Sequence, residues 1–158
     1  RYAETSPAPA ASSLVAQYWT FEAGALPDGG ADHVIPPDGL VSVWVSSDAS
    51  GSLFSGVTGP AEKAHRTVVH SAQRLVGARL QPGAGVSLFG SGMPTLVGRF
   101  LPLTEFAPSF ERPFAEAAAF ALAALAVPAN RSGVSVLRGV EGLEGAINAN
   151  LAAACRKG

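Results

Sequence analysis

Short apolar runs separated by turn residues fill the first half of the chain. Between residues 40 and 46, Val41, Val43 and Val45 fall on one face and Trp44 on the other, which is the two-residue period of a strand. Clusters of Gly, Pro, Asp and Ser end the runs and favour turns. The pattern predicts five or six short strands, at 14–22, 40–46, 52–58, 67–71 and 74–80, with the run 33–35 before a turn as the sixth. So many short strands in succession are typical of an antiparallel sandwich or barrel.

The period changes after Pro82, which suits the first turn of a short helix at 82–89. Farther along, apolar residues recur at three- and four-residue spacing and predict helices at 111–126 and 140–154. Their apolar stripes are Phe114, Ala118, Ala121, Leu122 and Leu125, and then Val140, Leu143, Ile147, Leu151 and Ala154. The sequence therefore predicts a mainly β, α+β fold with strands first and helices last.

The chain divides into three parts by composition. Residues 1–13 include a Pro, Ala and Ser stretch with nothing large to bury, and we interpret them as a flexible lead-in. A β-rich domain with its helices then covers 14–128. The remainder, 129–158, is interpreted as a helical segment or linker.

Charge and composition exclude several classes of protein. The 158 residues are 47% apolar and only 15% charged, which fits one folded domain. No apolar run approaches the roughly 18 residues that a membrane-spanning helix needs, so no membrane partner is expected. The 11 basic residues are scattered singly, which argues against nucleic-acid binding by this segment. The single Cys155 cannot form an internal disulfide, and we expect a cytoplasmic protein.

Few residues offer the chemistry of an enzyme or a metal site. The sequence has no His-x-His, and His65 and His70 are five residues apart, so a continuous strand would turn them to opposite faces. No Gly-x-Ser-x-Gly motif is present, and Cys155 lies at the end of a predicted helix, where the helix dipole disfavours a thiolate. We therefore expect no catalytic residue, no metal and no cofactor.

Four residues are candidates for binding a small molecule. Trp19, Trp44 and Phe54 lie on predicted strands and would line a pocket if the sheet encloses one. Arg79 precedes a predicted helix start, where a guanidinium and backbone N–H groups can meet an anion. The alternatives are core packing for the three aromatic residues and pairing with a carboxylate for Arg79.

The order and spacing of several short motifs match one known pattern. These are Tyr18-Trp19, then Val34-Ile35-Pro36-Pro37-Asp38-Gly39, then Gly56-Val57-Thr58-Gly59-Pro60, then Leu75-Val76-Gly77-Ala78-Arg79-Leu80-Gln81-Pro82-Gly83-Ala84, and finally Phe100-Leu101-Pro102-Leu103. Together they resemble the N-terminal sensor-type domain that precedes the helix-turn-helix region in some AraC-type bacterial transcription regulators. The resemblance covers roughly residues 14–126. Leu80 departs from it, because the pattern prefers Phe there.

The resemblance implies a small cupin-like antiparallel β-barrel followed by C-terminal helices. It implies a non-enzymatic module that senses a small-molecule effector, forms a homodimer, and meets DNA only through a helix-turn-helix domain that this chain lacks. The barrel of such regulators is usually free of metal. A free-standing cupin-like binding protein or a small enzyme is the alternative, and a helix-turn-helix pattern directly after residue 158 would favour the regulator.

Overall fold

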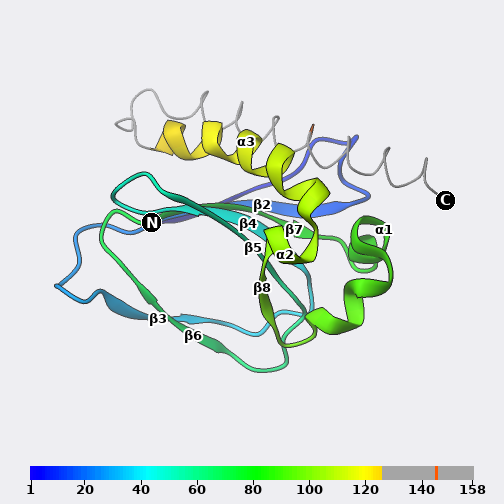
Figure 1. The fold of residues 1–158 in the computed structure, drawn as a ribbon, viewed down its shortest axis with the longest axis horizontal. Helices are drawn as coiled ribbons and strands as arrows, with labels where there is room; N and C mark the ends of the chain where they lie inside the picture. Colours follow the sequence, from blue (N-terminus) through cyan, green and yellow to red (C-terminus); the bar gives the residue numbers. More distant parts are fainter. Residues whose placement is uncertain (126–144, 146–158) are drawn as a thin grey trace.

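Six antiparallel strands form the main sheet of the computed structural model, which describes residues 1–125 and residue 145 (Figure 1). Their spatial order is β1, β2, β7, β4, β5 and β8. Their bounds are Tyr2–Thr5, Val15–Glu22, Arg74–Leu80, Ser42–Ser47, Leu53–Thr58 and Phe100–Pro102, in that order. The central strands are rich in Val, which packs well on a pleated surface.

Helices cover one face of this sheet, which we call the helix face. The long helix α3 (Pro108–Leu125) lies across it in Figure 1. From the helix, Phe110 and Phe114 reach a core in which Val43, Val45 and Val76 are fully buried. Glu111 ties the first turns of α3 to the sheet, because its Oε1 accepts a hydrogen bond of 2.8 Å from the buried hydroxyl of Ser55.

A segment of short helices and one short strand, which we call the connecting segment, joins β7 to α3. It comprises α1 (Ala84–Phe89), the 3-10 helix η1 (Gly90–Leu96), β8 and α2 (Leu103–Phe106). The ring of Phe89 lies 5.2 Å from that of Phe106 and 6.0 Å from that of Phe110, so this segment joins the same core.

A two-stranded ribbon lies on the opposite side of the main sheet from α3 (Figure 1). It consists of β3 (Ala31–Ile35) and β6 (His65–Val69), which pair only with each other among the described strands. The His33 ring lies 5.3 Å from that of Phe21 on β2, so the ribbon approaches the second face of the sheet. The molecule thus has three layers: helices, main sheet and β3–β6 ribbon.

The coarser sequence predictions are confirmed. An antiparallel fold with strands first and helices last is present, six strands lie between Val15 and Leu80, and helices α1 and α3 lie near the expected positions. The predicted helix at 140–154 lies outside the described residues.

Two features differ from the expectation. Residues 2–5, placed by sequence in a flexible lead-in, form β1 and pair with β2. The closed barrel is not confirmed either, because the described strands leave the six-stranded sheet open, with β1 and β8 at its edges. The physical reason is that β3 and β6 pair with each other and not with an edge of the main sheet.

Candidate functional site

The second face of the main sheet, which we call the aromatic face, carries all four sequence-predicted binding residues on the neighbouring strands β2, β7, β4 and β5. Strand register places Trp19 beside Gly77, Gly77 beside Trp44, and Trp44 beside Gly56. Directly paired residues point to the same side of a sheet. Tryptophan and glycine therefore alternate across four strands on this face.

The two glycines make room for the two indole rings. A Cβ on Gly77 would lie 2.5 Å from Cζ2 of Trp19, and one on Gly56 would lie 2.5 Å from Cζ2 of Trp44. No real Cβ sits so close to a carbon, so only glycine permits each ring to lie over the neighbouring strand. The indole rings thus lie along the surface of the sheet and do not project away from it.

The two indole N–H groups differ in their partners. Trp44 Nε1 donates a hydrogen bond of 3.0 Å to the hydroxyl oxygen of Thr58. Trp19 Nε1 is buried and has no hydrogen-bond partner among the described residues. A buried donor without a partner costs about 1–3 kcal/mol, so an acceptor supplied at this point would be favourable.

Three aromatic rings cluster at the β5 and β8 side of this face. The Trp44 ring lies 5.8 Å from that of Phe54 and 5.0 Å from that of Phe100, and the two phenyl rings stack at 6.2 Å. Trp44 is 8% exposed, whereas Phe54 and Phe100 are 45% and 42% exposed. We call these three residues the aromatic cluster. Its phenyl rings are packed against each other and still face solvent.

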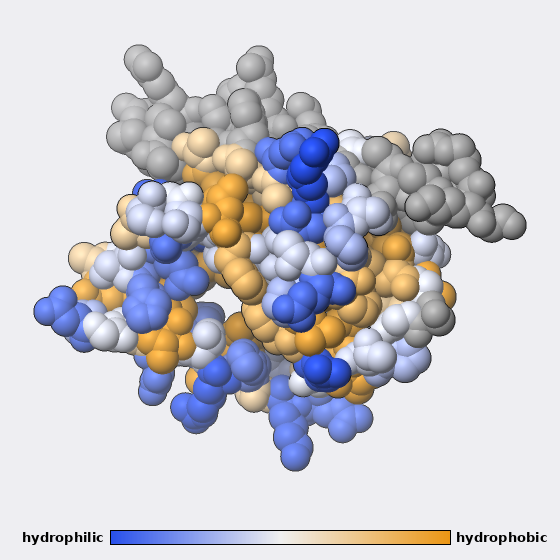
Figure 2. Space-filling model, viewed as in Figure 1, coloured by the Kyte–Doolittle hydropathy of each residue, from blue (hydrophilic) through white to orange (hydrophobic). Residues whose placement is uncertain are grey.

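An opening separates the β3–β6 ribbon from the main sheet. Figure 2 shows it as a gap in the space-filling surface, between the part of the molecule that carries the ribbon and the part that carries the sheet. Register places His33 and Thr67 on the side of the ribbon that contacts the sheet, with Ile35 and His65 farther along on the same side. Ile35 and His65 are exposed there, which agrees with an unfilled space.

Arg79 lies on the aromatic face and is paired with carboxylates. Its Nε lies 2.9 Å from Asp38 Oδ2, an ion pair without an aligned N–H bond, and its Nη1 lies 3.4 Å from Glu4 Oε1. The Tyr2 hydroxyl donates a hydrogen bond of 2.6 Å to Glu4 Oε1, and Gln17 Nε2 donates one of 2.7 Å to Oε2. One cation and two anions leave this group, which we call the acidic edge, with a net charge of −1.

The same contacts shift two pKa values at the acidic edge. The hydrogen bond from Tyr2, helped by the nearby Arg79 charge, lowers the pKa of Glu4 below its ordinary value. Burial, together with the hydrogen bond to Glu4, raises the pKa of the Tyr2 hydroxyl. At neutral pH the carboxylate therefore remains ionised and the phenol neutral.

The structure brings together the sequence-predicted residues in part. Trp44 and Phe54 are in ring contact, Trp19 lies two strands from Trp44 on the same face, and Arg79 is at the acidic edge. Sequence reasoning missed Phe100, because it belongs to the connecting segment after η1, and it missed Glu4, because it belongs to the supposed lead-in. The alternation of Trp and Gly was the available signal, but only strand register reveals it.

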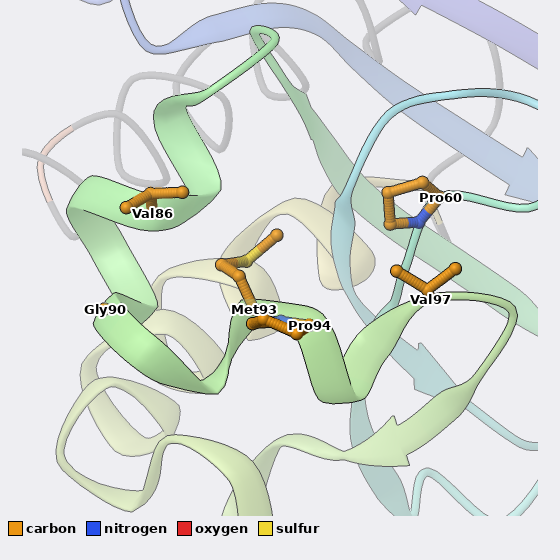
Figure 3. A pocket seen from close by; sticks show the side chains of 6 residues that line it. All are labelled: Pro60, Val86, Gly90, Met93, Pro94 and Val97. Carbon is orange, nitrogen blue, oxygen red and sulfur yellow. The ribbon is translucent and has the colours of Figure 1, made fainter.

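A second hollow lies on the outside of the connecting segment. Figure 3 shows this apolar cleft, which has a volume of about 500 Å³. It is lined by Pro60, Val86, Gly90, Met93, Pro94 and Val97. It offers almost no polar group for orienting a ligand.

Over residues 1–125 and 145, no three His, Cys, Asp or Glu side chains come together in a way that could hold a metal ion. In the same part of the chain, no helix combines the length and the apolar character that crossing a membrane requires.

Comparison with known proteins identifies the domain without naming its activity. No curated protein and no solved structure matches the chain. A family model described as a domain of unknown function, DUF6597, matches residues 3–102, which include β2 to β8 and all of β1 except Tyr2. The chain accordingly belongs to the DUF6597 family.

Proposed function

We propose that this chain is the effector-binding module of an AraC-type transcription regulator and that it binds a small molecule between the aromatic face and the β3–β6 ribbon. The observation that carries the proposal is the aromatic cluster: two stacked phenyl rings, nearly half exposed, on the side of the sheet that borders an opening. Binding pockets are concave and mostly apolar, with a few polar groups that orient the ligand.

The energetic argument concerns the exposed area of the cluster. Covering the exposed parts of Phe54 and Phe100 would remove roughly 160 Å² of apolar surface from water, worth about 4 kcal/mol. This gain fits a ligand with a large apolar surface.

The regulator part of the proposal rests on the motifs that resemble AraC-type sensor domains. In the structure, those motifs supply Trp19, Gly56, Gly77, Arg79 and Asp38, which are among the residues that build the aromatic face and its acidic edge. We interpret the main sheet and the ribbon as an opened cupin-like half-barrel. The module itself is proposed to be non-enzymatic, with DNA contacted only by a helix-turn-helix domain outside this chain.

Homodimerisation through the segment 140–154 is part of the same proposal. Burying a carboxylate in such a seam would separate the subunits, so Ile147→Asp should give a folded monomer where the wild type is dimeric. Light scattering measures the difference. A free-standing binding protein or small enzyme is the alternative, and a helix-turn-helix sequence directly after residue 158 would favour the regulator.

Binding at the aromatic face can be tested with a neutral fluorescent probe, N-phenylnaphthylamine, whose emission rises in an apolar site. Phe54→Ser and Phe100→Ser should each weaken probe binding about tenfold, because each removes a stacking ring. Leu53→Ser is the matched control. Leu53 adjoins Phe54 on β5, is 49% exposed, and points to the opposite face.

The apolar cleft supplies a second control, since the probe could bind there instead. If Val97→Ser abolishes the emission and Phe54→Ser leaves it unchanged, the cleft is the binding site and the proposal is wrong. If no variant changes the emission, the aromatic face does not bind the probe and the proposal is equally wrong.

A further inference from the structure

We propose that the ligand of the aromatic face is an organic cation, an amine or ammonium carried on a planar apolar body. The inference rests on the proposed function and narrows it to one class of ligand. Its basis is the combination of aromatic rings with a net negative charge at the border of the same face.

The first step is the charge around the site. Glu4 is the direct cross-strand neighbour of Trp19, so a carboxylate lies beside the indole. Asp38 lies at the other side of Arg79, and the two carboxylates outnumber the single guanidinium. The positive charge of Arg79 is thereby neutralised, and one negative charge remains in excess.

The second step is the charge of the ribbon that borders the opening. Its ionised side chains, Asp32 and Arg66, are one of each sign, and register turns both away from the sheet. In the loop before β6, Glu62 and Lys63 also cancel. The titratable side chains on the inner side of the ribbon are the imidazoles of His33 and His65. The ribbon therefore does not reverse the excess negative charge of the acidic edge.

The third step is the chemistry of the rings. The face of an aromatic ring is electron-rich, and a cation within about 6 Å of the ring centre is attracted to it. Beside Glu4 the aromatic face presents the stacked rings of Tyr2 and Trp19, whose centres are 6.5 Å apart, and the aromatic cluster lies farther along the same face, from β4 to β8. Rings and a nearby carboxylate together are the recurring arrangement for recognising ammonium groups.

An anionic ligand fits the same site poorly. Arg79 is the only cationic side chain of the described residues on the aromatic face, and Glu4 and Asp38 already occupy it. An anion would have to displace one carboxylate and then lie beside the other. The sequence-based idea of Arg79 as an anion contact is therefore not the reading that this arrangement favours.

The experiment compares three probes that share one naphthalene ring and differ in charge. They are naphthylmethylammonium, naphthylmethanol and naphthoate, titrated into the whole chain by isothermal calorimetry near neutral pH. The ammonium should bind about three- to fivefold more tightly than the alcohol, and the carboxylate most weakly, because the excess charge is partly exposed to solvent.

Variants at the acidic edge test the origin of the preference. Glu4→Gln keeps the shape and removes the charge, so the ammonium should lose its advantage and the alcohol should bind as before. Glu116→Gln is the matched control, because Glu116 is an exposed carboxylate on α3, away from the aromatic face. It should leave all three affinities unchanged.

Salt dependence on the wild type gives a readout that needs no substitution. Raising the salt from about 0.1 M to about 1 M shortens the screening length from about 10 Å to about 3 Å, so the preference for the ammonium should shrink. Equal binding of ammonium and alcohol, or tighter binding of naphthoate, overturns the cation inference and leaves the proposed function standing. Failure of all three probes to bind overturns the proposed function itself.

Discussion

The two faces of the main sheet differ in their residues and in how far those residues are buried. The helix face carries Val43, Val45, Val57 and Val76, all fully buried beneath α3, and they fit one another as a core does. The aromatic face carries large rings, two glycines that accept those rings, and a group of paired charges. The first arrangement is explained by stability alone. The second keeps large apolar rings half in water, which stability does not explain.

Truncating one ring on each face should give the largest difference between them. Phe114→Ala removes a fully buried ring beneath α3 and should lower the free energy of unfolding by about 3–5 kcal/mol. Phe54→Ala removes a ring that is 45% exposed and should cost only about 1 kcal/mol. Urea denaturation followed by circular dichroism measures both. Equal losses of unfolding free energy in the two variants would contradict the conclusion that the helix face, and not the aromatic face, provides the stability.

A methyl group added at Gly77, the buried glycine of β7, should have the next largest effect on stability. In Gly77→Ala the new Cβ meets the Trp19 ring and lies 2.8 Å from the Val43 carbonyl oxygen. Overpacking of this kind costs about 1–3 kcal/mol, and the displaced indole should weaken probe binding as well. Gly24→Ala is the control, because no atom lies within 4 Å of its added Cβ, and it should change stability by less than about 0.5 kcal/mol. An unchanged Gly77→Ala protein would show that the rings do not need the glycine.

The smallest effect concerns acid stability at the acidic edge. Because the folded-state pKa of Glu4 is lowered, its contribution to stability is present above the ordinary pKa and is lost as the pH falls through the folded value. The wild type should therefore lose slightly more stability than Glu4→Gln between about pH 5 and about pH 3. Thermal melts across that range measure the difference. Parallel losses in the two proteins would mean that Glu4 has no folded-state partner that favours its charge.

The helix face could be predicted from the sequence because it depends on local period. One buried stripe is revealed by the alternation of apolar and polar positions in residues 41–45. The other is revealed by the three- and four-residue spacing of apolar residues from Phe114 to Leu122. In the structure the two stripes pack together in one core. Those signals lie within single elements. They need no knowledge of which strands are neighbours.

The aromatic face depends on neighbours, and so it was predicted only in part. Trp19, Trp44 and Phe54 could be found as aromatic residues on strands, but their shared face follows from the strand order, which places β7 between β2 and β4. Phe100 and Glu4 come from segments with weak strand patterns, a three-residue strand and a region next to a Pro, Ala and Ser stretch. Their roles arise from pairing with β5 and β2, which no local pattern encodes.

The position of both indole rings on one face of the sheet has a practical consequence for the search for the natural ligand. The whole chain contains two tryptophans, and both lie on the aromatic face. Selective excitation of tryptophan therefore reports on this one surface and on no other part of the protein. A metabolite library can be screened on the unlabelled wild-type chain by the quenching or spectral shift of its own emission. Trp19→Phe and Trp44→Phe then divide the signal between the side near Glu4 and the side near Phe100.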